Sequence, residues 1–191
     1  MRARFLSKLR SRSRLTRTLV ALVSTVLVGG QPMLAAPQGE RVVHGSATFE
    51  RDGANTVIHA GDNAIIHYDS FDIAGNESVR FVQPGELARV LNRVESDMAT
   101  HIEGSLTANG RVYIVNPAGV FFGDGALVDA GAIYAAAGTI TDENFLANVD
   151  HFADLGGDVE NLGTINAETA ALIGQHVKNS GTIESTDGLV I

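Results

Sequence analysis

Two stretches decide the fold of this chain: Val159-Glu160-Asn161-Leu162-Gly163-Thr164-Ile165 and, 18 residues later, Val177-Lys178-Asn179-Ser180-Gly181-Thr182-Ile183. The same spacing relates Ala171-Leu172-Ile173 to Leu189-Val190-Ile191. A fixed period with strand-forming residues and Gly or Asn corners is typical of a solenoid, in which each coil covers the next. The 18-residue period suits a β-helix coil of about three short strands. A chance resemblance inside a β-sandwich is the alternative interpretation.

The repeat also places one asparagine over another. Asn161 and Asn179 hold the same position in successive coils, two residues before a corner glycine. Side-chain amides that stack in this way can hydrogen-bond to one another, because each has both donors and acceptors. We therefore predict a ladder of amide bonds at this corner, through Asn161 and Asn179.

Short strand-like runs continue through the chain from Glu40 onward. Each run is rich in β-branched or aromatic residues and is bounded by Gly, Asn or Asp, which indicates turns at close spacing and an all-β fold. One helix is predicted, at Asp142–Ala147, with Thr141 as its N-cap and two acids at its positive end. The predicted strands are Val57–His59, Ala64–Tyr68, Val79–Val82, Arg111–Val115 and Val120–Phe122.

The first 36 residues have the pattern of a secretory signal peptide. Seven of the 14 basic residues lie in the first 17 positions, and an apolar run follows at Leu19–Val28. Small residues then precede a predicted cleavage after Ala35 or Ala36. An uncleaved anchor or a buried helix is the alternative, although the run is shorter than the roughly 20 residues that a membrane helix needs.

These observations divide the chain into a signal peptide at residues 1–36 and a single domain at residues 37–191. The domain stops at Ile191, an apolar strand position with no polar capping turn after it. Because the last coil of a solenoid has to be covered, we expect this domain to be the front of a longer protein.

Charge and composition exclude several classes of partner. Beyond residue 36 the chain keeps seven basic and 22 acidic residues, a formal charge of −15. Such a domain repels phosphates, so we expect no nucleic-acid partner. The absence of cysteine excludes disulfides and thiolate chemistry. The histidines are spaced neither as a helical pair nor as a zinc site, so no metal and no cofactor are predicted; they are His44, His59, His67, His101, His151 and His176.

The segment Ala108–Gly123 resembles a known family. It reads Ala-Asn-Gly-Arg-Val-Tyr-Ile-Val-Asn-Pro-Ala-Gly-Val-Phe-Phe-Gly and is similar to the hallmark segment of the filamentous haemagglutinin N-terminal domain, the TPS domain of two-partner secretion. Family members read Asn-Gly-x-Val-hydrophobic-hydrophobic-x-Asn-Pro-Asn-Gly-Ile-x-Phe-Gly. Further family-like stretches follow in family order, so the resemblance covers about residues 40–191: Asn63–Ile66, Ser70–Ile73, Val90–Val94 and Ile140–Leu146.

The chain departs from the family pattern at two points. Ala118 stands where the family usually has Asn, and a second motif, Asn-Pro-Asn-Leu, is absent. Pro117 and Gly119 still suit a β-turn. By resemblance, the candidate transporter-recognition turn is Asn116, Pro117, Ala118, Gly119 and Val120, and a secondary family motif is Asn92, Arg93 and Val94. A corner that merely sets the register of the coils is the alternative interpretation of the turn.

The resemblance implies both a fold and a function. The implied fold is a right-handed parallel β-helix with extra-helical β-hairpins and one short helix. The implied function is to target an exoprotein or adhesin for secretion: the signal peptide leads into the periplasm, and an outer-membrane β-barrel transporter with POTRA domains recognises the domain. Folding of the β-helix outside the cell would be nucleated here, giving a secreted or cell-surface product. Contacts with a host or neighbouring cell would belong to a region beyond Ile191.

Two other function classes share this fold. A small β-helix carbohydrate-active enzyme would need paired carboxylates, for which Asp52, Asp62, Asp69 and Asp72 are the candidates. Asp is also what turns prefer, and basic residues that would bind an acidic sugar are scarce, so we predict no catalytic residue and no enzymatic activity. A purely structural surface protein is the other class, and it differs from a secretion domain in needing no transporter.

Overall fold

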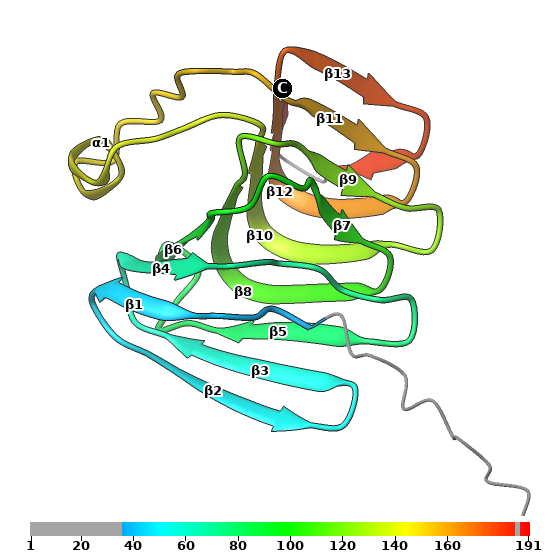
Figure 1. Ribbon diagram of the computed structural model, residues 1–191. Coiled ribbons are helices and arrows are strands. Elements are labelled where there is room, and N and C mark those ends of the chain that lie inside the picture. Colours follow the sequence, from blue (N-terminus) through cyan, green and yellow to red (C-terminus); the bar gives the residue numbers. More distant parts are fainter. Residues whose placement is uncertain (1–35, 186–187) are drawn as a thin grey trace, which may run out of the picture. The chain divides into compact units, whose positions relative to one another are not determined.

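The computed structural model describes residues 36–185 and 188–191 (Figure 1). The predicted signal peptide at residues 1–36 therefore lies outside the described residues, apart from Ala36. The described chain is mostly β with one short helix, as predicted. Its elements are β1 (Arg41–His44), β2 (Ala47–Asp52), β3 (Asn55–Ala60), β4 (Ala64–Tyr68), β5 (Ser78–Val82), β6 (Arg89–Val94), β7 (Thr100–Ile102), β8 (Ser105–Val115), β9 (Val120–Phe122), β10 (Leu127–Ala136), α1 (Asp142–Leu146), β11 (Asp158–Asn161), β12 (Thr164–Ile173), β13 (His176–Asn179), β14 (Thr182–Glu184) and β15 (Leu189–Val190).

The strands form two sheets. The first has the order β1-β4-β6-β8-β10-β12-β14, with β2, β3, β5 and β15 attached, and the second has the order β13-β11-β9-β7. Among the described strands, only β1 with β4 and the hairpin of β2 with β3 pair antiparallel. Each of β8, β10 and β12 of the first sheet is followed by a strand of the second, and we call such a pair a layer: β8–β9, β10–β11 and β12–β13. Figure 1 shows these layers one above another.

The 18-residue repeat is the register between neighbouring strands. Asp158–Asn161 of β11 pairs residue by residue with His176–Asn179 of β13, and Thr164–Asn166 of β12 pairs with Thr182–Glu184 of β14. The repeat therefore predicted the stacking correctly, because residues at equal positions of the repeat became neighbours across a parallel ladder.

The predicted extension of the repeat to the last three residues is wrong. Thr169 and Ala170, rather than Ala171 and Leu172, pair with Leu189 and Val190. The chain takes five positions from Glu184 to Leu189 but only three along the matching part of β12, so the register shifts by two residues. A shift of two leaves each side chain on the same face of the sheet.

Along each strand the side chains point alternately to the interior and to the outside, as a period-two sequence requires. Ile58 of β3, Phe81 of β5 and Val128 of β10 are fully or almost fully buried, and they belong to one interior cluster that runs through all layers. The predicted strands at Ala64–Tyr68 and Val120–Phe122 coincide with β4 and β9. The predicted strand at Arg111–Val115 is the second half of the longer β8.

A second apolar cluster lies on the opposite face of the first sheet. Between β10 and β11 the chain leaves the sheets for residues 137–157, a segment we call the excursion, which carries α1 to one side of the sheets (Figure 1). Thr141 caps α1 as predicted, since its side chain accepts a hydrogen bond from the Asn144 amide. Ile140 and Phe145 of the excursion pack on the outer side of β4, β6 and β8, which explains why these strands are buried on both faces.

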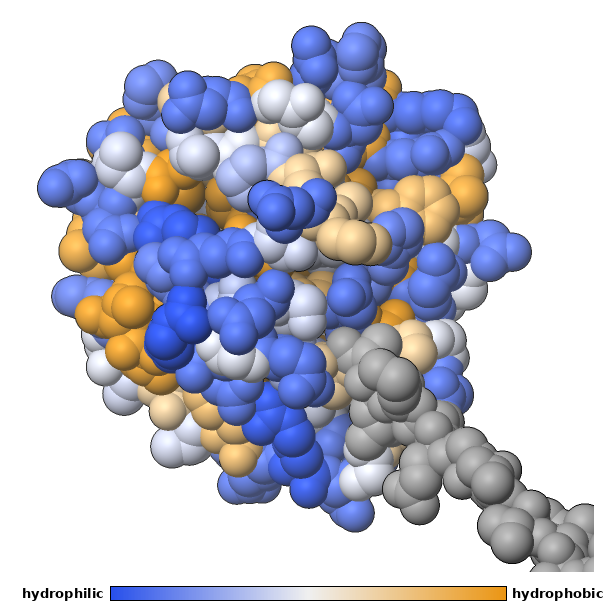
Figure 2. All heavy atoms as spheres, viewed as in Figure 1, coloured by the Kyte–Doolittle hydropathy of each residue, from blue (hydrophilic) through white to orange (hydrophobic). Residues whose placement is uncertain are grey.

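Most of the visible surface is hydrophilic, with small apolar areas between charged side chains (Figure 2). Such a surface suits the strongly acidic composition beyond residue 36. In the described part of the chain, no helix is long and apolar enough to cross a membrane.

Candidate functional site

The turn at Asn116–Val120 connects the two strands of one layer, β8 and β9. Gly119 donates its backbone N–H to the Asn116 carbonyl at 3.0 Å, which closes a β-turn. The Asn116 side chain tightens that turn, because its Oδ1 accepts the Ala118 N–H at 3.0 Å. Asn at the first position and Pro at the second are the residues that such a turn favours.

The other end of the Asn116 amide binds a neighbouring loop. Its Nδ2 donates to the Met98 carbonyl at 3.0 Å and to Thr100 Oγ1 at 3.1 Å. The side chain is fully buried, so its oxygen and nitrogen both act inside the protein. Asn116 therefore joins its own turn to the loop at residues 95–99, a segment that sequence reasoning did not single out.

The rest of the turn is closed in by the chain around it. Gly119 has φ of +128°, and a Cβ there would lie 3.0 Å from the Asp158 carbonyl oxygen. A Cβ on Gly157 would lie 2.6 Å from the carbonyl oxygen of Pro117. The next layer therefore packs backbone against backbone on this turn. Val120 is buried, Ala118 is half-buried and Pro117 is exposed.

The secondary motif, Asn92-Arg93-Val94, lies directly beside the turn. It ends β6, and Asn92 and Arg93 pair in register with Ile114 and Val115 of β8. Asn92 is fully buried and donates its Nδ2 to the Tyr113 carbonyl at 3.0 Å.

Arg93 holds the excursion to β6. Its Nη2 donates to the Ile140 carbonyl at 2.7 Å and forms an ion pair with Asp142 at 2.8 Å. Its Nη1 contacts His67 Nε2 at 2.8 Å. Since a guanidinium only donates, His67 Nε2 is the acceptor of this bond.

The two motifs meet in one hollow of about 300 Å³. The sequence around each motif does not predict that the two motifs lie side by side, because this contact follows from the pairing of β6 with β8. The hollow also takes in residues of the loop at 95–99, and it is lined by Arg93, Val94, Glu95, Ser96, Asp97, Val115, Pro117, Gly138 and Thr139.

The predicted corner asparagines lie far from this hollow in the sequence and touch each other. Asn161 is fully buried, and its Nδ2 donates to Asn179 Oδ1 at 2.9 Å. Each asparagine also accepts the backbone N–H of the glycine two residues on, Gly163 and Gly181, at 3.1 and 3.2 Å. In both, the side-chain oxygen accepts the backbone N–H two residues further on, as Asn116 Oδ1 accepts that of Ala118.

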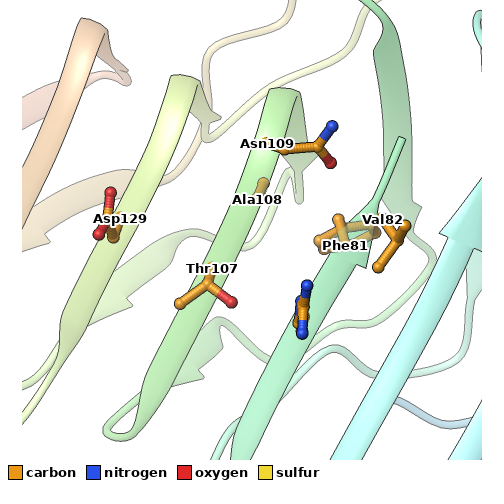
Figure 3. A pocket seen from close by; sticks show the side chains of 7 residues that line it. Phe81, Val82, Thr107, Ala108, Asn109 and Asp129 are labelled. Atoms are coloured by element: carbon orange, nitrogen blue, oxygen red, sulfur yellow. The ribbon is translucent and has the colours of Figure 1, made fainter. Parts of the chain in front are cut away.

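An open hollow of about 460 Å³ lies on the outer face of the first sheet (Figure 3). Thr107 of β8 and Asp129 of β10, which pair in register, project toward it beside Asn109. The four aspartates considered for catalysis are not among its lining residues. Three of them have partners of their own: Asp62 accepts the Arg89 N–H, Asp69 pairs with Arg41 and Asp72 accepts the His101 N–H. In the described residues, no three His, Cys, Asp or Glu side chains cluster as a metal site.

Comparison with known proteins adds three relatives. Two curated heme/hemopexin-binding proteins of Haemophilus influenzae are 41% identical over 101 residues and 34% identical over 163 residues. These matches cover 52% and 79% of this chain, but the chain spans only 11% and 18% of those proteins. The crystal structure of the HMW1 secretion domain from Haemophilus influenzae matches 78% of this chain and 42% of its own, with a TM-score of 0.75 and 35% identity.

A family model named the TPS secretion domain matches residues 35–191. The match covers all of the described residues, and it agrees with the resemblance of the turn segment to two-partner-secretion proteins. The chain belongs to the TPS secretion domain family.

Proposed function

We propose that this TPS secretion domain is read by an outer-membrane β-barrel transporter with POTRA domains, and that the reading takes place before its layers have stacked. The domain would then fold outside the cell and start the folding of the exoprotein that carries it. The role is one of targeting, without catalysis. Membership of the family supports the transporter as the partner.

One observation carries the timing: folding hides the motif residues. Asn92 and Asn116 are fully buried, Val94 and Val120 almost so, and both amides are hydrogen-bonded inside the protein. A transporter that met the folded domain would find Pro117 exposed and the Asn116 amide out of reach. The motif can therefore serve a partner while the chain is extended, and afterwards hold the turn and β6 in place.

The test is secretion of the full chain from a Gram-negative host, with and without a transporter of this family, for Asn116→Ala and Pro117→Ala. We expect both variants to lose transporter-dependent secretion, and because Pro117 is exposed in the folded domain, Pro117→Ala should do so with little loss of stability. The control is Gly157→Ala, which should disturb the same turn in the folded state through its contact with Pro117 while leaving residues 116–120 unchanged.

Circular dichroism and thermal unfolding of the variants separate recognition from folding. If Asn116→Ala and Gly157→Ala lose stability equally, only Asn116→Ala should lose secretion. Equal secretion losses would mean that residues 116–120 act through folding alone. Secretion of the unaltered chain without any transporter would contradict the proposed function itself.

The stacked layers support a second proposal, that the domain is a right-handed parallel β-helix with the β2–β3 hairpin and the excursion outside its coils. The strands β8, β10, β12 and β14 pair in parallel, and along the chain a strand of the second parallel sheet follows each of the first three. This order supports such a winding. A crystal structure of the secreted chain would test the winding and its handedness.

For the whole exoprotein we propose a heme-related ligand, since both curated relatives carry the name heme/hemopexin-binding protein. The chain spans a small part of those relatives, so this activity would belong to the whole protein. Titrating hemin and hemopexin against the full exoprotein and against this chain would test the proposal. Saturable binding by the exoprotein is the expected result.

A further inference from the structure

Arg89 of β6 is a buried arginine held by neutral groups. Its side chain is 7% exposed together with its backbone, and no ion pair in the described residues includes it. Burying a cation in this way is unfavourable unless hydrogen bonds replace the lost water. The acceptors come from two distant segments: Asn63 Oδ1, the Phe145 carbonyl at 2.9 Å and Asn148 Oδ1 at 2.7 Å.

Both asparagines that bind Arg89 have an unusual backbone conformation. Asn63 and Asn148 each have φ of 58°, a left-handed conformation that few non-glycine residues adopt. The guanidinium also lies over the Phe145 ring, 5.0 Å from its centroid. A planar fork with several donors and a stacking face suits this set of partners, and a lysine would not replace it.

Arg89 and Arg93 together hold α1 at both ends. They are four residues apart on one strand, so their side chains leave the same face of the sheet. Arg93 binds the start of the helix at Ile140 and Asp142, and Arg89 binds its end at Phe145 and Asn148.

The excursion in turn covers several strands. Phe145 is fully buried against Tyr113 of β8, with ring centroids 5.2 Å apart and the rings nearly perpendicular. Tyr113 donates its hydroxyl to Asp150 at 2.9 Å. The cluster beneath also contains Ile65 of β4 and Leu91 of β6. The excursion thus contacts side chains from three strands that enter the sheet much earlier in the chain.

We infer that the excursion opens and closes together with β4, β6, β8 and β10, as one cooperative unit, and that Arg89 is the positioning residue that brings it into that unit. A surface segment between two strands ordinarily opens alone and at low free energy. Here its helix is bound at both ends to β6, and its aromatic ring completes the packing of the strands.

One consequence concerns export and rests on the proposed function. The partners of Arg89 in the excursion lie 56 and 59 residues further along the chain. The unit therefore closes only after the chain has emerged from the cell as far as Asn148. This length of chain must be outside before the folded domain can prevent the chain from moving back through the transporter.

Hydrogen exchange of the full chain tests the cooperative unit. In the unaltered protein, the hydrogen-bonded amides of Phe145, Ala147 and Val149 should exchange about as slowly as those of β8. Arg89→Met should speed the exchange of these three amides at least ~10-fold, because the excursion loses its hydrogen bonds to the buried guanidinium. Arg89→Lys should speed the exchange of these amides less than Arg89→Met does, but it should not restore the exchange rates of the unaltered protein.

Two further variants make the test specific. Arg80→Met makes the same chemical change on β5, the preceding strand in the chain, where Arg80 is exposed, and should leave the excursion unchanged. Asn148→Gly keeps the left-handed backbone and removes one acceptor, so it should speed the same amides to a smaller degree. It also decides the question if Arg89→Met does not fold.

The inference is overturned if these amides already exchange far faster than β8 in the unaltered protein, or if neither Arg89→Met nor Asn148→Gly changes them. The export consequence has its own readout: Arg89→Met should slow transporter-dependent release from the cell surface. Normal release together with faster exchange would overturn the consequence and keep the folding unit. A failure of transporter dependence in the unaltered chain would instead count against the proposed function.

Discussion

The Asn116 side chain bonds three groups through one amide: the Ala118 N–H of its own turn, the Met98 carbonyl and the Thr100 hydroxyl. Asn116→Ala leaves these groups without partners in a buried place. We predict a loss of about 2–4 kcal/mol in the free energy of unfolding, measured by urea titration. Asn76→Ala is the matched control, because Asn76 is exposed, and it should cost less than about 1 kcal/mol. Equal losses for the two variants would contradict the role given to Asn116.

Gly157 is the second decisive position at the scale of single residues. A Cβ there would meet the backbone oxygen of Pro117, which cannot move aside as a flexible side chain could. We predict that Gly157→Ala destabilises the fold by about 1–3 kcal/mol in thermal unfolding. Gly85→Ala should be neutral or slightly stabilising, since an added Cβ at Gly85 meets nothing within 4 Å. A stable Gly157→Ala would mean that the layers are not packed this closely at the turn.

At the scale of elements, β8 and β10 place two tyrosines in contact. Tyr113 and Tyr134 stack in parallel with ring centroids 4.2 Å apart. Burial raises the pKa of Tyr113, and nearby Tyr134 and Asp150 raise it further. Burial also raises the pKa of Tyr134 and that of Tyr68, the third tyrosine of the chain.

These shifts predict a loss of stability in alkali. Below the ordinary tyrosine pKa of about 10, folded and unfolded chains hold the same phenolic protons. Above it the unfolded chain releases protons that the folded chain keeps, so the free energy of unfolding falls as pH rises. We expect no phenolate absorbance near pH 10 in the folded protein. As the pH is raised further, phenolate absorbance should appear together with the loss of the circular dichroism signal. Phenolate absorbance in a protein that is still folded would contradict the burial of these rings.

The elements also show where sequence reasoning succeeds. The β4 and β9 strands were predicted at their full bounds, because alternation and turn residues are local signals. Thr141 marked the start of α1 for the same reason. The pairing of Leu189 with Thr169 was missed, since it depends on two extra positions after Glu184 that the repeat does not contain.

At the scale of the whole molecule, the repeat predicted the stacking, and the family resemblance selected the motif residues, whose role stays a prediction. They did not predict that Asn92-Arg93-Val94 would lie beside the Asn116 turn, because that contact depends on which strands become neighbours. The partners of Arg89 were equally beyond reach, since they lie 56 and 59 residues away in a segment with no strand pattern. Long-range contacts of polar side chains leave no periodic signal in one sequence.

The residue-by-residue register of β11 with β13 and of β12 with β14 has a consequence for how such genes grow. A tandem duplication of residues 158–175 inserts one whole 18-residue period, so every old neighbour finds an equivalent new one. We predict that this duplication keeps cooperative unfolding and raises the urea m-value, because more surface is buried. A 17-residue duplication should unfold the region, since an odd step turns inward side chains outward. Where successive coils are in this regular register, insertions should therefore come as whole 18-residue periods.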